Sequence, residues 1–198
     1  MAELLGDPVE HVGPNRLPFE DGAFQRVVSI DVLEHITEPE TFARELRRVT
    51  ATDGQVIVTV PGGDRRKLAN RIKEAIGMTQ DEYGHKRAGY SVEELSSIMG
   101  AVGIAPRRCV TFSRFFTELA ELMINFAYVK KMSRKSKMKP DKGTIAPATE
   151  QQLLAVKKAY RLYSIVFPIV WLMSKLDSTL FFTSGYVTMV EGKPLPQT

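Results

Sequence analysis

The stretch that decides the fold is LPFEDGAFQRVVSIDVLEH, residues 17–35. It contains a turn signal at Asp21-Gly22 and continues into a short apolar run, VVSI, at residues 27–30. Aspartate and glycine favour a sharp bend, whereas β-branched residues favour an extended strand. The run shows no alternation of polar and apolar residues, so we expect a strand that is buried on both faces, as in a parallel sheet.

Three polar residues, Asp31, Glu34 and His35, follow this predicted strand directly. In an open parallel sheet, ligands bind outside the carboxyl ends of the strands. The cluster therefore indicates a functional site at the end of the strand. A purely structural role stays open beside this interpretation, in which Asp31 and His35 bond to each other and cap the next segment.

A helix and a second strand complete a βαβ unit after this cluster. Residues 37–40, TEPE, predict the start of the helix, with Thr37 as the capping residue and a carboxylate three residues later. Asp53-Gly54 is expected to end the unit ahead of a strand at residues 55–60, QVIVTV. The apolar residues at helical spacing are Phe42, Leu46 and Val49.

The rest of the chain continues the alternation of helices and strands. Residues 91–94, SVEE, predict a capping box at the start of a helix that ends at Gly103. The other predicted elements are helices at residues 64–76, 115–129 and 149–176, the last interrupted by Pro168, and strands at residues 108–112 and 185–191.

These motifs, in this order, resemble the second half of the class I S-adenosylmethionine-dependent methyltransferases of type 11. The resemblance rests on LPFEDGAFQRVVSIDVLEHI, ARELRRV, DGQVIVTVP, GHKRAGYSVEELSSIMGAVGI and the last predicted strand. It implies an α/β fold, with a partial Rossmann-like methyltransferase sheet and a mostly helical C-terminal insertion. The expected domains are a partial methyltransferase domain at residues 1–113, a basic and apolar insertion or cap at 114–182, and the last strand and tail at 183–198.

The resemblance also implies S-adenosylmethionine as the cofactor. The residues expected to form an apolar wall near its adenine are Leu17, Pro18 and Phe19. The residues expected around its methionine part share the end of the first strand, and they are Asp31, Val32, Leu33 and Glu34. Backbone groups there would hold the cofactor, and side chains would face the methyl acceptor.

Two histidines are candidates for the general base, because an imidazole titrates near neutral pH. His35 is the first candidate, and His85 is the second because it lies in a glycine-flanked segment before a helix, where it would enter the site from a lid. In quinone-biosynthesis O-methyltransferases a similar E-x-x-E-H motif is thought to bind a divalent metal, and Asp31, Glu34 and His35 match it with Asp for the first Glu. Many family members carry L-E-H with no known metal, so we expect no metal here.

The largest departure from the family lies at the start of the chain. The glycine-rich loop of the family and the acid that binds the ribose have no counterpart, since Gly6 and Gly13 are isolated. We therefore expect a fragment or an N-terminally truncated chain that lacks about 50 to 80 residues of the domain. In the family strand order, 3-2-1-4-5-7-6, the strand at residues 26–30 would pair with the absent first strand, and its open edge is expected to favour self-association.

Charge and apolar patterning suggest a second kind of contact. Residues 130–142 hold seven Lys or Arg against one Asp, within a net charge of +4. Such a run favours an anionic partner, and its Met and Ser, in place of stacking aromatics, argue against nucleic acid. We expect peripheral membrane contact through residues 115–175, or a helical cap over the active site. The uncharged stretch at residues 162–174 is too short for a membrane span, which needs about 20 residues.

Together these features predict an S-adenosylmethionine-dependent methyltransferase that acts on a small-molecule or lipid-like acceptor. The expected location is the cytoplasm, or the inner face of the membrane. The alternative is a non-catalytic, membrane-peripheral or partner-binding remnant of the same fold, because the cofactor loop is missing. A nucleotide-binding oxidoreductase fits less well, since its glycine fingerprint is equally absent.

Overall fold

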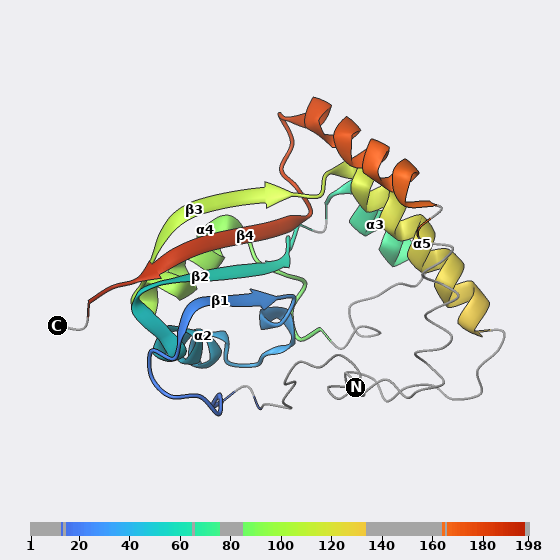
Figure 1. The fold of residues 1–198 in the computed structure, drawn as a ribbon. Coiled ribbons are helices and arrows are strands. Elements are labelled where there is room, and N and C mark those ends of the chain that lie inside the picture. The colour runs from blue at the N-terminus through green and yellow to red at the C-terminus, as the bar shows by residue number, and fades with distance from the viewer. Residues whose placement is uncertain are drawn as a thin grey trace.

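The computed structural model describes residues 13, 15–64, 66–75, 85–133, 164 and 166–196. These residues form a mixed α/β fold around a four-stranded sheet with the order β1-β2-β4-β3 (Figure 1). The strands are β1 (Phe24–Ile30), β2 (Thr50–Pro61), β3 (Ile104–Phe112) and β4 (Val187–Pro194). β1 and β2 pair in parallel, and β4 runs antiparallel to both β2 and β3. This is the order 4-5-7-6 that the resemblance implied for this part of the sheet.

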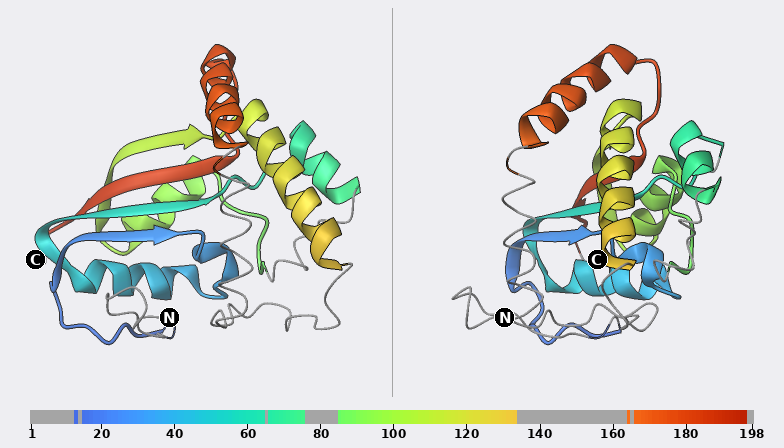
Figure 2. Two further views of the ribbon diagram at one scale, coloured as in Figure 1. Left: turned by 45° about the vertical axis from the view of Figure 1, so that its right-hand side comes forward. Right: turned by 90° about the vertical axis from the view of Figure 1, so that its right-hand side faces the viewer.

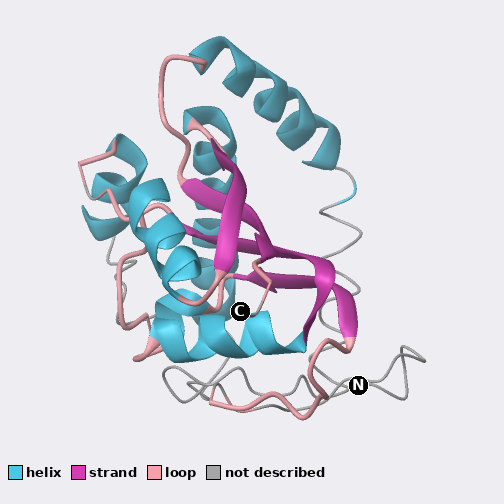
Figure 3. Cartoon of the chain, turned by 90° about the vertical axis from the view of Figure 1, so that its left-hand side faces the viewer, coloured by secondary structure: helices cyan, strands magenta, loops and turns pink. Residues whose placement is uncertain are grey.

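Two helices cover one face of the sheet and build the core with it. They are α2 (Pro39–Val49) and α4 (Val92–Ala101), and Figure 3 shows them on the same side of the strands. α2 buries Phe42, Leu46 and Val49, which confirms the predicted helical spacing. The fully buried residues opposite the helices include Val56, Val58, Val60 and Val190. Burial of such side chains contributes about 1.5–3 kcal/mol each, so this layer carries most of the stability.

The prediction that the first strand is buried on both faces is wrong. Val28 is 55% exposed and Ile30 is 63% exposed, whereas Ser29, which points to the other face, is buried. β1 is an edge strand of the described sheet: one edge pairs with β2, and no described strand pairs with the other edge. The apolar run correctly indicated a strand that pairs in parallel. It did not indicate whether other residues cover the face that carries Val28 and Ile30. Self-association through this edge stays a prediction.

Two boundary predictions were also wrong. α2 begins at Pro39, so Glu38 and not Thr37 is the N-cap, and no side chain caps the helix. The Thr41 hydroxyl donates instead to the Glu38 carboxylate at 3.2 Å. Asp53-Gly54 lies inside β2, where the β1–β2 register shifts between Phe24 and Arg26. Gly54 is needed there, because an added Cβ would lie 2.9 Å from the Gln25 carbonyl oxygen.

The predicted capping box is confirmed at the start of α4. The Glu94 N–H donates to the Ser91 hydroxyl at 3.2 Å, and the Ser91 N–H donates to the Glu94 carboxylate at 2.9 Å. The helix ends ahead of Gly103, whose φ of +81° is a conformation that favours glycine. Local sequence therefore determined both ends of this helix.

The segment between β3 and β4 is mostly helical among its described residues. It contains α5 (Phe115–Ser133), a helix at residues 166–176 and η3 (Asp177–Leu180). These elements and α3 (Leu68–Ala75) lie beyond the carboxyl ends of β1 and β2 (Figures 1 and 2). The predicted basic run lies partly outside the described residues, as does the first part of the helix expected at 149–176. Among the described residues, no helix is long and apolar enough to cross a membrane.

Asp177 joins this segment to the sheet through the N-terminus of α5. Its carboxylate accepts from the backbone N–H groups of Arg114 at 2.8 Å, Phe116 at 2.8 Å and Thr117 at 3.2 Å. The carboxylate is buried, and it satisfies N–H groups that a helix start leaves unpaired.

We expect Asp177→Ala to lower the free energy of unfolding by about 1–2 kcal/mol, because three donors lose their acceptor. Urea denaturation followed by circular dichroism measures the change. Ser178→Ala is the matched control, since its exposed hydroxyl donates to the Lys175 carbonyl of the preceding helix and makes no hydrogen bond to α5 in the described part of the chain. An unchanged midpoint for Asp177→Ala would show that the cap contributes nothing.

Candidate active site at the carboxyl end of β1

The chain turns sharply where β1 ends. Asp31 has a φ of +51°, a left-handed conformation that is uncommon outside glycine, and its N–H donates to the Thr59 carbonyl at 3.0 Å. The turn leads into a short 3-10 helix, η1 (Leu33–His35). Leu33 and Glu34 are buried in this helix, whereas the His35 side chain is 31% exposed. The turn therefore places a buried carboxylate and a solvent-accessible imidazole at the ligand edge of the sheet.

A second segment, residues 85–90, is held against η1 by main-chain bonds. The N–H groups of Lys86 and Arg87 donate to the Glu34 carbonyl at 2.8 Å and 3.2 Å. The Tyr90 hydroxyl donates to the Leu33 carbonyl at 3.2 Å, and the Tyr90 ring is fully buried. The segment follows η1 by about 50 residues of sequence, and these bonds bring it to the end of β1.

Gly89 lets this segment approach the end of β2. Its φ is +131°, and an added Cβ would lie 2.0 Å from the Pro61 carbonyl oxygen. That same carbonyl accepts from the Tyr90 N–H at 2.9 Å, and the Tyr90 carbonyl accepts from the Thr188 hydroxyl at 2.9 Å. The close approach ties residues 85–90 to β2 and β4 as well as to η1.

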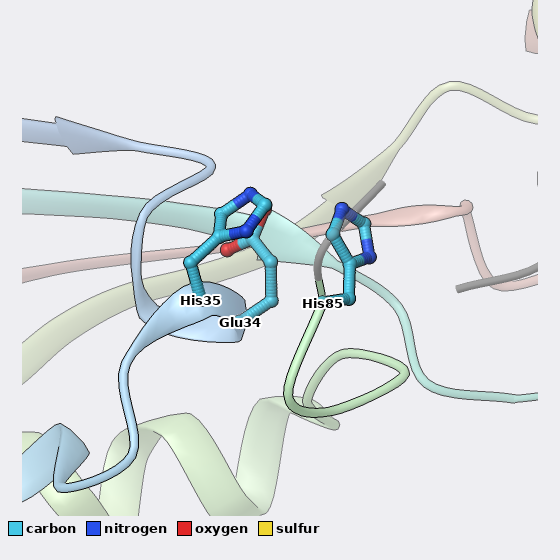
Figure 4. Close-up of side chains that lie close together, drawn as sticks. All are labelled: Glu34, His35 and His85. Carbon is cyan, nitrogen blue, oxygen red and sulfur yellow. The ribbon is translucent and has the colours of Figure 1, made fainter. Parts of the chain in front are cut away.

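The result is a cluster of Glu34, His35 and His85, shown in Figure 4. His85 stands across from the other two, and its ring meets the His35 ring edge-on with centroids 4.6 Å apart. His35 Nε2 lies 4.0 Å from Glu34 Oε1. One nitrogen or oxygen from each of the three residues lies within 4.8 Å of the others. The expected approach of His85 to His35 is therefore seen in the structure, and their roles as bases stay predictions.

Burial raises the pKa of the Glu34 carboxyl, and the nearby Asp31 carboxylate raises it further, whereas His35 lowers it. Glu34 is 1% exposed, and neither of its carboxylate oxygens has a hydrogen-bond partner. A buried carboxylate without a partner is unfavourable, because the protein does not replace its hydration. The carboxylate therefore favours a nearby proton or cation.

The structure separates the predicted adenine wall from this cluster. Leu17 donates its N–H to Glu45 at 2.9 Å, and Arg48 donates to the carbonyls of Leu17 at 3.0 Å and Phe19 at 2.8 Å. These bonds hold residues 17–19, with Pro18 exposed, beside the end of α2, where β1 begins. The adenine role of these residues stays a prediction, as does the role of Val32, which is partly buried beside Leu33.

Sequence reasoning missed Gly89 and Tyr90 as the residues that position His85. Both lie inside the GHKRAGYSVEEL motif, where the capping box was the stronger local signal. A glycine directly before a buried aromatic residue and a helix cap is the feature that indicates a close backbone approach.

We expect Gly89→Ala to lower the free energy of unfolding by about 1–3 kcal/mol, because the added methyl group overlaps the Pro61 carbonyl. Gly100→Ala is the control with the opposite sign. It lies in α4 with nothing within 4 Å of its added Cβ, and alanine there should stabilise the helix by up to about 1 kcal/mol. Thermal and urea unfolding of both variants test the pair, and equal effects would refute the close approach at Gly89.

Comparison with known proteins agrees with this geometry. A family model described as a methyltransferase domain matches residues 7–58, which include β1, η1, α2 and most of β2. Ajmaline N-methyltransferase from Rauvolfia serpentina is 43% identical over 42 residues, which cover 21% of this chain and 14% of that enzyme. The family-model match thus contains the turn at Asp31 and the carboxylate and imidazole of η1.

Solved structures share the fold at low sequence identity. A SAM-dependent methyltransferase from Thermotoga maritima superposes with a TM-score of 0.51 at 17% identity, covering 98% of this chain and 67% of the other. The [4+2]-cyclase SpnF superposes with a TM-score of 0.53 at 18% identity, covering 98% and 60%.

The chain spans about three fifths to two thirds of the length of these solved structures, and its match to the curated relative is shorter still. The strand order 4-5-7-6, the family-model match and the shared fold agree with one another. The described residues thus share the fold of these solved structures, and residues 7–58 match the methyltransferase-domain model.

Proposed function

We propose that this chain contributes to a methyltransferase that moves a methyl group from S-adenosylmethionine to a small-molecule or lipid-like acceptor. The observation that supports this most is the turn at Asp31, because it lies in the matched segment and at the edge of the sheet where ligands of this fold bind. The cofactor carries a sulfonium and an ammonium group, and the exposed Asp31 carboxylate gives this edge a complementary charge.

The roles proposed for individual residues follow from their positions. Backbone groups of residues 31–33 would hold the methionine part of the cofactor, with the Asp31 carboxylate facing its ammonium group. The imidazoles of His35 and His85 would face the acceptor, where either can take a proton from the attacking atom. Transfer itself is an in-line displacement, so the main task of the protein is to hold the two substrates in line.

We expect S-adenosylhomocysteine to bind the 198-residue chain saturably in isothermal titration calorimetry. Asp31→Asn should raise the Kd about fivefold, equivalent to about 1 kcal/mol, since the amide keeps the size but loses the charge. Asparagine also tolerates the left-handed backbone, so the fold should persist. Asp53→Asn, an exposed position at the start of β2, is the matched control. A folded chain that shows no saturable binding up to about 1 mM would overturn the proposal.

A second candidate function, contact with a membrane surface, is favoured by exposed apolar side chains on the segment before β4. The largest exposures are those of Phe181 at 80% and Phe182 at 74%, and their rings meet edge-on at 5.7 Å. The preceding helix exposes Ile169, Trp171 and Leu172, each by more than half. The Lys175 ammonium lies 5.3 Å from the centre of the Trp171 ring, an arrangement that suits the headgroup level of a bilayer.

We expect the chain to float with vesicles of anionic lipid at low salt and to float less with neutral vesicles. The double substitution Phe181→Ser and Phe182→Ser should remove most of the bound fraction, because it removes the apolar tip. Leu68→Ser, at a residue of α3 that is 53% exposed, is the matched control and should float like the wild type. Equal flotation of all three proteins would exclude the tip as the contact.

A further inference from the structure

The buried carboxylate of Glu34 is the feature that the proposed methyl transfer leaves unexplained. It is 1% exposed, it lacks a hydrogen-bond partner for either oxygen, and it lies beside two imidazoles on separate segments. A methyl donor held by backbone groups does not require an acid in this position. An acid that is buried without a hydrogen-bond partner usually indicates a ligand site, an ion site or a strained site.

The three side chains offer the donors of a metal site. One carboxylate oxygen and two imidazole nitrogens lie within 4.8 Å of one another, and His35 Nε2 lies 4.0 Å from Glu34 Oε1. Figure 4 shows His85 facing the other two residues from the opposite segment. The sequence alone led us to expect no metal, but it did not place His85 beside Glu34 and His35. We propose that Glu34, His35 and His85 bind a divalent transition-metal ion, with Zn²⁺ as the best fit.

The donor set selects the kind of metal. Imidazole nitrogen suits zinc and its transition-metal neighbours, whereas magnesium and calcium prefer oxygen ligands throughout. With metal–ligand bonds of about 2.0–2.2 Å, tetrahedral donors lie about 3.3 Å apart, so the donor atoms, now within 4.8 Å of one another, must approach by up to about 1.5 Å. The proposal requires the two imidazoles to rotate about their side-chain bonds when the metal binds.

Main-chain hydrogen bonds already hold the two segments that carry the three ligands next to each other. The Glu34 carbonyl accepts from Lys86 and Arg87, so the segment that carries His85 is fixed to the same residue that supplies the carboxylate. Two ligands are adjacent in η1, and the third comes from a segment tied down by Gly89 and Tyr90. Three protein ligands leave a coordination position for water or for an acceptor atom, as in catalytic zinc sites.

This inference does not rest on the proposed methyl transfer, since metal binding is measured without cofactor or acceptor. It does affect the proposed roles of the histidines. An imidazole nitrogen bound to a metal cannot also take a proton, so His35 and His85 would act as bases only in the metal-free chain.

The test is metal titration of the chain after treatment with a chelator. We expect one Zn²⁺ per chain by calorimetry, one Co²⁺ by its visible absorption, and binding of Mg²⁺ at least about a hundredfold weaker. His35→Ala and His85→Ala should each weaken Zn²⁺ binding at least about tenfold. Glu34→Gln, which keeps the shape of the side chain, should do the same and should abolish the rise in unfolding temperature that Zn²⁺ gives the wild type.

The third histidine of the chain provides the matched control. His11→Ala removes an imidazole that lies outside the described residues, and we expect it to bind Zn²⁺ like the wild type. Circular dichroism first establishes that each variant is folded. The proposal is overturned if the folded wild type binds no stoichiometric Zn²⁺, or if His85→Ala and His11→Ala bind it equally well. Normal S-adenosylhomocysteine binding in either case would leave the proposed function in place.

Discussion

The candidate site depends on one main-chain group, the Glu34 carbonyl, which accepts hydrogen bonds from two backbone N–H groups. Lys86 and Arg87 make these bonds from a segment that is distant in sequence. A single residue therefore both supplies the buried carboxylate and fixes the loop that brings the second imidazole. Because Tyr90 and Gly89 attach the same loop to η1 and β2, the site is held from both elements at once. A change in this loop would therefore move His85.

The site also concentrates features that are individually unfavourable. Asp31 adopts a left-handed backbone, and Glu34 is buried without a hydrogen-bond partner. The packed layer of α2, α4 and the sheet supplies the stability that allows both to persist. Such a combination at the ligand edge is typical of a site shaped for binding, since a purely structural turn gains nothing from either feature.

Sequence patterns correctly predicted features that neighbouring residues determine, such as helix ends and buried helix faces. They failed for features that depend on contacts with distant parts of the chain. The capping box at Ser91 and the buried spacing of α2 were predicted because neighbouring residues determine them. The exposure of Val28 was not, because burial of a strand depends on what packs against it. His35 and His85 were both expected at the site, but the contact of their rings was not predicted, since it arises from main-chain bonds between segments that are distant in sequence.

The fold alone does not determine the chemistry of this edge. The neighbours that share the fold include both a SAM-dependent methyltransferase and a [4+2]-cyclase, so similar sheets support different reactions. What distinguishes this chain must lie in the side chains that its loops bring to the carboxyl end of β1. A buried carboxylate facing two imidazoles is a donor set for protons or for a metal, and both uses require the loop at residues 85–90 in place. The position of that loop is therefore the property on which any function of the site depends.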